Sequence, residues 1–186
     1  MKIGEFRAVE VEPPYRLTLA QGIAGGDKMD WLIEKAVELG ASGFVPLATA
    51  RSVVRLTGER AQRRQQHWQG VVRASCEQCG RNRLPDVTPV GEIGPWLGTL
   101  SREPAPDELR LLLSPRASIG FAALPDAPPL GGVTLLIGPE GGLSGDEEAA
   151  AVEQGFTSVG LGPRVLRTET AGIAVLAALA ARWGGW

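Results

Sequence analysis

The pattern of apolar and polar residues predicts strands that alternate with helices along the 186-residue chain. Residues 15–23 alternate apolar and polar side chains, as expected of a strand with one buried face. The runs ELRLLL (108–113) and GVTLLIG (132–138) are continuously apolar, which is typical of strands in a sheet covered on both faces. FVPLAT (44–49) and SVGLG (158–162) predict two more short strands, and Pro46 restricts the first to an edge or a strand end.

Two helices are expected in the first half of the chain. In GGDKMDWLIEKAVELGAS, apolar residues recur at three- and four-residue spacing, with Asp27 as the expected N-cap and Gly40 closing the helix. A longer helix fits residues 59–79, because one stripe of its surface holds Trp68, Val71, Val72, Cys76 and Cys79.

Further helices follow in the second half. A weak helix is expected around EIGPWLGTL, in a Pro- and Gly-rich passage over 84–107. Ser144 and Glu147 form a capping box for a helix over 145–154, and Thr168 is the expected cap of a last helix within 167–183. Strands alternating with helices predict an α/β protein with a mostly parallel sheet and helices on both faces.

Composition favours a cytoplasmic protein. Hydrophobic residues make up 44% and charged residues 22% of the chain, which is ordinary for a globular protein. MKIGEFRAVEVEPP lacks the apolar run of a signal peptide, and the longest apolar stretch, 171–181, is too short to span a bilayer. The two cysteines are too few for a disulfide framework. No membrane association is expected.

The near-neutral net charge hides a basic segment. Residues 51–83 hold eight arginines against two glutamates, so this stretch is strongly positive and the rest of the chain is negative. One reading is a solvated helix face. Arginine is also the better bidentate partner for phosphate, and the pattern favours binding of a polyanion.

Three loops leave the carboxyl ends of predicted strands: LLLSPRAS (111–118), LIGPEGGLS (136–144) and GLGPRVLRTETA (160–171). In open α/β sheets the ligand crevice lies at those strand ends, so we expect one shared site. The loops are rich in Gly, Pro and exposed backbone groups, which suits a flat neutral group such as adenine. Glu140 either holds its loop in shape or accepts a hydrogen bond from a ligand hydroxyl.

Other chemistries fit poorly. No Lys follows the glycines as a P-loop requires, and GPEGG does not match a Rossmann fingerprint. Cys76, Cys79 and the lone His67 give at most three ligands, so no metal site is expected. His67 has no nucleophile elbow nearby, which argues against a hydrolytic triad.

Six motifs carry a resemblance to a known family. KMDWLIEKAVELGA, RSVV, EQCGRNRLP, LSPRAS, LLIGPEGGLSGDE and LGPRVLRTETA occur in this order and cover about residues 15–183. Together they closely resemble the RsmE family of SPOUT-class methyltransferases. The resemblance implies S-adenosylmethionine-dependent methylation of N3 of a uridine in 16S ribosomal RNA of the small subunit. It also implies a C-terminal deep trefoil knot and a homodimer formed through helices that border the cofactor cleft.

The resemblance also implies which residues form the site. Those expected to bind the cofactor are Leu113, Ile137, Gly138, Pro139, Glu140, Gly141, Gly142, Leu143, Leu161, Gly162, Leu166 and Thr168. Those expected to contact RNA are Arg55, Arg63, Arg64, Arg116, Arg164 and Arg167. Arg164 and Arg167 could instead pair with Glu169 or Glu140.

Arg51 and Arg81 are the candidate catalytic residues. Arginine stays protonated, so its expected role is to stabilise negative charge on O2 and O4 of the uracil as N3 loses its proton. Glu77 is a weaker candidate for accepting that proton. Replacing Arg81 by Ala would then lower turnover and leave cofactor affinity nearly unchanged.

Family members usually begin with a PUA-like RNA-binding domain. Here residues 1–14 would be a remnant of that domain and residues 15–186 the methyltransferase domain. Two alternatives remain open: a methyltransferase of the same class that acts on another RNA such as transfer RNA, and a non-catalytic RNA-binding factor in ribosome assembly. EQCGRN argues against the first, and an intact cofactor loop argues against the second.

Overall fold

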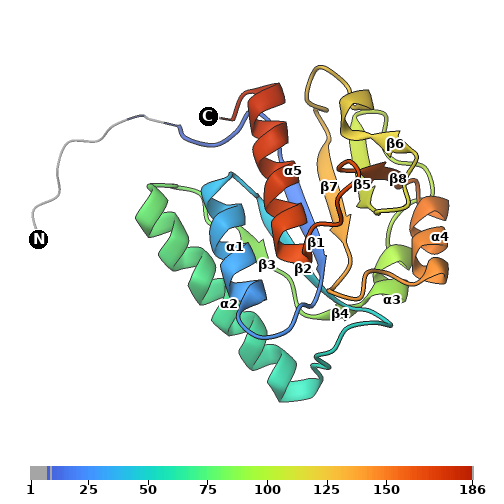
Figure 1. Ribbon diagram of the computed structural model, residues 1–186. Helices are drawn as coiled ribbons and strands as arrows, with labels where there is room; N and C mark the ends of the chain where they lie inside the picture. Colours follow the sequence, from blue (N-terminus) through green and yellow to red (C-terminus); the bar gives the residue numbers. More distant parts are fainter. Residues whose placement is uncertain (1–7, 9, 186) are drawn as a thin grey trace, which may run out of the picture.

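A computed structural model describes residue 8 and residues 10–185. Its centre is one parallel sheet (Figure 1). The main strands are β1 (Leu17–Gly22), β2 (Gly43–Ala48), β5 (Glu108–Leu113), β7 (Gly132–Ile137) and β8 (Thr157–Gly160). Three two-residue strands complete it: β3 (Asp86–Val87), β4 (Gly91–Glu92) and β6 (Ile119–Gly120).

The strand order is β3-β2-β1-β7-β5-β8-β6, with β4 also pairing with β2. All seven strand pairings are parallel. The five main strands lie where the sequence predicts them. The order is not sequential, because β7 lies between β1 and β5 although it follows both in the chain. The carboxyl ends of β7, β5 and β8 therefore meet at one edge.

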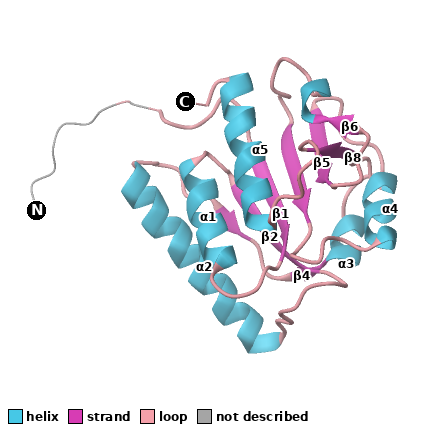
Figure 2. Ribbon diagram, in the orientation of Figure 1, coloured by secondary structure: helices cyan, strands magenta, loops and turns pink. Residues whose placement is uncertain are grey.

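Helices cover both faces of the sheet, as predicted (Figure 2). On one face lie α1 (Lys28–Glu38), α2 (Gly58–Cys79) and α5 (Thr168–Trp183). On the other lie α3 (Ile93–Gly98) and α4 (Gly145–Glu153). A 3₁₀ turn spans Phe121–Ala123. Each face has its own core: Leu17, Leu19 and Leu135 pack under the first group, and Leu112, Leu136 and Phe156 under the second.

The structure confirms the predicted helices and two details of how they begin or end. Gly40 follows α1 with a φ of +86°, a conformation that favours glycine. The capping box of α4 is present, since the Ser144 hydroxyl accepts from the Glu147 N–H at 3.2 Å and the Glu147 carboxylate accepts from the Ser144 N–H at 2.8 Å. No helix in the described part of the chain is long and apolar enough to cross a membrane.

Two local predictions are wrong. Thr168 is not the cap of α5: the N-cap is Arg167, with extended φ and ψ, and Thr168 is the first helical residue. Its hydroxyl is used elsewhere, since it donates to the Gly138 carbonyl at 2.6 Å. Pro46 does not confine β2 to an edge, because β2 has neighbours on both sides. Pro46 falls between the part of β2 that pairs with β3 and the part that pairs with β4.

Candidate functional site

The three glycine- and proline-rich loops line one cavity of about 620 Å³. The loop after β5 supplies residues 113–116, the loop after β7 supplies 137–143, and the segment between β8 and α5 supplies 161–162 and 164–168. This volume lies within the range of small-molecule sites, about 300–1,000 Å³. The sheet order explains the convergence, since β7, β5 and β8 are neighbours and end together.

The loop over residues 138–144, called the glycine loop below, folds as a tight turn. The Gly142 N–H donates to the Pro139 carbonyl at 2.8 Å, and Gly142 has a φ of +67°. A Cβ on Gly138 would lie 2.6 Å from the backbone nitrogen of Leu143, so a side chain has no room there. Glycine is thus required at position 142 by conformation and at position 138 by contact.

A second loop closes against the glycine loop. The Ala50 N–H donates to the Glu147 carboxylate at 2.7 Å, so the capping-box residue of α4 also holds the loop after β2. This brings Arg51 to the cavity, where its Nη1 donates to the Gly141 carbonyl at 3.0 Å. Arg51 remains exposed, and its charge is available at the mouth of the cavity.

Glu140 fastens the glycine loop to the start of α1. Its Oε1 accepts from the Lys28 ammonium at 2.7 Å and from the Gly25 N–H at 2.9 Å. Burial alone would raise the pKa of Glu140, but hydrogen bonds from Lys28, from its own N–H and from Gly25 outweigh that effect and lower the pKa. Of the two roles predicted for Glu140, the structure supports holding the loop in shape.

The structure brings together all twelve residues that the sequence assigns to the cofactor, and every one lines the cavity. Of the arginines assigned to RNA, Arg116, Arg164 and Arg167 also line it. Arg116 pairs with Glu148 at 2.8 Å. Within residues 10–185, neither Arg164 nor Arg167 forms an ion pair, so the alternative that they pair with Glu169 or Glu140 is not seen.

The other arginines assigned to RNA lie away from the cavity. Arg55 is exposed on the loop before α2, and Arg63 lies on the exposed face of α2 near Glu59. Arg64 lies over the Trp68 ring, 5.6 Å from its centroid, and within 3.8 Å of the Asp30 carboxylate. None of these three side chains lines the cavity: Arg63 and Arg64 lie on α2, and Arg55 lies just before it.

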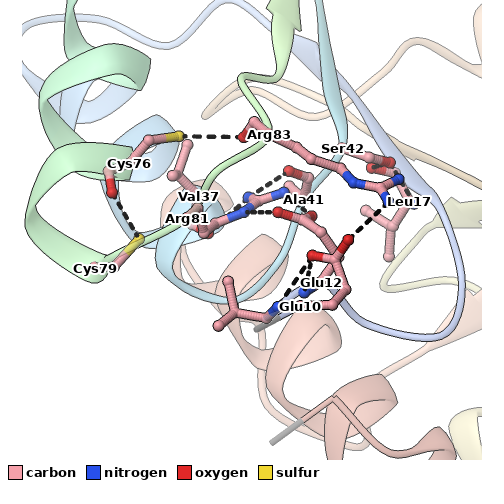
Figure 3. A network of polar contacts seen from close by, with 11 residues as sticks. Glu10, Glu12, Leu17, Val37, Ala41, Ser42, Cys76, Cys79, Arg81 and Arg83 are labelled. Carbon is pink, nitrogen blue, oxygen red and sulfur yellow. Dashed lines mark hydrogen bonds and ion pairs between the residues drawn. The ribbon is translucent and has the colours of Figure 1, made fainter. Parts of the chain in front are cut away.

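Arg81 does not line the cavity, so the structure does not support its assignment as a catalytic residue. Figure 3 shows its side chain in a network of polar contacts with Glu12, Val37 and Ala41. Its side chain is 5% exposed and forms an ion pair with Glu12. The same guanidinium donates to the carbonyls of Val37 and Ala41 at 2.9 and 2.8 Å. Because Arg81 lies in the turn after α2, these contacts join that turn to the segment before β1 and to the end of α1. Glu77, the candidate proton acceptor, is exposed on α2 and does not line the cavity either.

Sequence reasoning missed several residues of the cavity wall. Lys28 belongs to the motif KMDW, but nothing in the sequence points it towards a loop more than a hundred residues away. Glu148 lies in the first turn of α4, where acidic residues are common for reasons of helix capping alone. The remaining missed residues are Ser114, Pro115, Val159, Val165, Glu169 and Ala171.

Comparisons with known proteins point to one family. A family model described as an RNA methyltransferase domain matches residues 11–180. Ribosomal RNA small subunit methyltransferase E of Bacillus subtilis is 35% identical over 90% of this chain and 66% of its own length. The protein of the same name from Buchnera aphidicola subsp. Schizaphis graminum is 36% identical over 94% of this chain and 68% of its own. The chain thus spans about two thirds of these relatives.

Comparison with solved structures points to the same family. Ribosomal RNA small subunit methyltransferase E from Neisseria gonorrhoeae, bound to S-adenosyl methionine, is 37% identical with a TM-score of 0.82, over 92% of this chain and 68% of that one. A putative methyltransferase from Legionella pneumophila, in complex with the same cofactor, is 38% identical with a TM-score of 0.83, over 93% and 69%. A SpoU methyltransferase from Streptomyces viridochromogenes shares the fold at 15% identity, with a TM-score of 0.51 over 89% and 59%.

Proposed function

Because the chain belongs to the RsmE family of ribosomal RNA small subunit methyltransferases, we propose that it methylates N3 of a uridine in 16S ribosomal RNA. The methyl donor is S-adenosylmethionine, and the reaction takes place in the cytoplasm on the small ribosomal subunit. The observation that carries this proposal is that one cavity is lined by all twelve residues that the family resemblance assigns to the cofactor.

The residues at the cavity fit this cofactor. Leu113, Ile137, Leu161 and Leu166 supply apolar walls for a flat base, and the glycine loop brings backbone groups close to it. When bound, the cofactor supplies an electrophilic methyl group on a sulfonium. The protein contributes alignment, since much of the rate of methyl transfer comes from holding the nucleophile in line with that methyl group.

Arg51 is the residue of this chain best placed to assist the uracil. It is exposed at the cavity mouth and its guanidinium lies against the glycine loop. As N3 loses its proton, negative charge develops on O2 and O4 of the uracil, and a fixed cation stabilises that charge. Arg164 and Arg167 also line the cavity and would contact RNA phosphates. Arg63 and Arg64 on α2, with Arg55 on the loop before it, extend the positive surface.

We also infer a homodimer that forms over α1 and α5, the helices beside the cavity. A hollow of about 400 Å³ lies between the starts of these helices, lined in part by Trp31 and Glu169. Trp31 is 44% exposed in the single chain, and a partner helix packed over α1 would cover it. In the same proposal, the chain between β8 and α5 forms the deep trefoil knot expected of SPOUT enzymes.

Isothermal titration with S-adenosylmethionine tests the cofactor site. Gly142→Val should weaken binding at least about tenfold, because a β-branched residue is strained at positive φ and its side chain would enter the cavity. Gly145→Ala is the matched control: it lies at the start of α4, outside the cavity wall, with no positive φ and open space around its Cβ. Its affinity should equal that of the wild type. Failure of the wild type to bind the cofactor would refute the proposal.

A further inference from the structure

A polar side chain is buried directly beneath the glycine loop. Gln21 lies near the end of β1, on the same face as Leu17 and Leu19, and is 2% exposed. Alternate residues of a strand share a face, so an apolar residue would be expected at this position. Gln21 does not line the cavity, and the proposed mechanism gives it no role.

Its amide connects three segments that are far apart in sequence. The Gln21 Nε2 donates to the carbonyls of Gly22 at 2.8 Å and Gly138 at 3.1 Å, and lies 2.9 Å from the Thr168 hydroxyl oxygen. The Thr168 hydroxyl donates to the same Gly138 carbonyl at 2.6 Å. The amide nitrogen has two hydrogens for these three acceptors, so they are shared among the two carbonyls and the Thr168 hydroxyl. Gln21 and Thr168 thus hold the first residue of the glycine loop.

The chain packs too closely at Gly22 and Gly138 for a side chain at either position. A Cβ on Gly22 would lie 2.6 Å from Pro139 Cδ and 2.7 Å from the Pro139 nitrogen. Within the glycine loop, a Cβ on Gly138 would lie 2.6 Å from the Leu143 nitrogen. No side chain at these two positions can therefore fix where the loop leaves β7, whereas hydrogen bonds to the Gly138 carbonyl can.

Stability alone does not account for a glutamine here. The Gln21 Oε1 is buried and has no hydrogen-bond partner among the described residues. A leucine of similar size would fill the space without leaving such an oxygen unpaired. The choice of glutamine is explained if orienting the loop matters more than the stability that the unpaired oxygen costs.

We propose that Gln21 is a positioning residue for the cofactor site, which acts through Gly138 and Thr168. Both of those residues line the cavity and Gln21 does not. The identity of the ligand rests on the function proposed above. The positioning itself is a property of the free protein and can be measured without ligand.

The first test compares Gln21→Leu with Ser42→Ala by titration with S-adenosylmethionine. Ser42 is the matched control, since its hydroxyl bonds the backbone of Leu17 at the opposite end of the same strand. Gln21→Leu should weaken cofactor binding by about tenfold, the equivalent of losing one or two hydrogen bonds that orient the loop. Ser42→Ala should lower the unfolding temperature and leave cofactor affinity as it is.

A second pair of variants addresses the same carbonyl from the other side and covers the case in which Gln21→Leu does not fold. Thr168→Val removes the hydroxyl that donates to Gly138, and Thr168→Ser keeps it. Thr168→Val should bind S-adenosylmethionine more weakly than the wild type does. Thr168→Ser should bind it with the affinity of the wild type.

Hydrogen exchange in the free protein gives a readout that needs no ligand. Amides of the glycine loop should exchange faster in Gln21→Leu than in the wild type, and at the wild-type rate in Ser42→Ala. Unchanged loop exchange together with unchanged cofactor affinity in Gln21→Leu would overturn the proposal. If the wild type binds no cofactor, the proposed function fails, and loop exchange still decides the role of Gln21.

Discussion

At the scale of single residues, Arg51 carries the chemical part of the proposed function. It is the one catalytic candidate that the cavity retains, and its guanidinium is held by the Gly141 carbonyl. Arg51→Ala should lower turnover about 10²–10³-fold, the usual cost of removing one donor that stabilises a developing oxyanion. Cofactor affinity should change little, because the bond from the Gly142 N–H to the Pro139 carbonyl and the ion pair of Glu140 with Lys28 still hold the glycine loop. Single-turnover methylation and cofactor titration together measure both quantities.

Arg51→Lys provides the contrast. Lysine keeps the charge and loses the planar fork, so partial recovery of turnover would indicate that charge matters more than geometry. If Arg51→Ala lowers cofactor affinity as much as turnover, Arg51 only supports the glycine loop, and the assignment to the uracil is wrong.

Residue types that act through the backbone were predictable, and those that act through side chains were less so. The glycine loop could be recognised in the sequence, because several glycines directly after an apolar strand have few structural explanations. The structure does not support the catalytic role predicted for Arg81. A sequence cannot distinguish an arginine that faces a ligand from one that is buried against Glu12. Gln21 was overlooked, although a polar residue at a core position of a strand is a signal that could have found it.

At the scale of elements, the ion pair of Arg81 and Glu12 fastens the segment before β1 to the turn after α2. Arg81→Ala should lower the free energy of unfolding by about 3–5 kcal/mol, because it leaves a largely buried carboxylate without its partner. Cofactor affinity should not change, since Arg81 lies outside the cavity. Urea unfolding followed by circular dichroism measures the first effect.

The neighbouring pair of Arg83 and Glu10 is the matched control. It joins the same two segments at 2.7 Å, but its side chains are 71% and 48% exposed. Solvent screens such pairs, so Arg83→Ala should cost about 0–1 kcal/mol. Lost turnover in Arg81→Ala without lost stability would restore the catalytic role that the sequence suggested.

Long elements with a clear period were predictable, and short ones were not. The boundaries of α2 and β5 agree with the apolar patterns of residues 59–79 and 108–113. The strands β3, β4 and β6 have two residues each, too few for any periodicity. The start of α5 was misplaced because the Thr168 hydroxyl bonds to Gly138, a partner thirty residues away that local sequence cannot reveal.

At the scale of the whole molecule, the site exists because β7 is inserted between β1 and β5. This order places the loops after β5, β7 and β8 side by side, and the resemblance to RsmE enzymes predicted their common role. Apolar patterns alone gave a parallel α/β sheet, without the order of its strands. The homodimer and the knot remain predictions from the family.

The most direct test of the proposed function is methyl transfer to small ribosomal subunits from a strain that lacks the modification. The chain would be incubated with these subunits and S-adenosylmethionine, and the RNA digested for mass analysis of its nucleosides. The proposed function predicts one new nucleoside, 3-methyluridine, in 16S ribosomal RNA. A different methylated nucleoside, or none although the protein binds the cofactor, would contradict it.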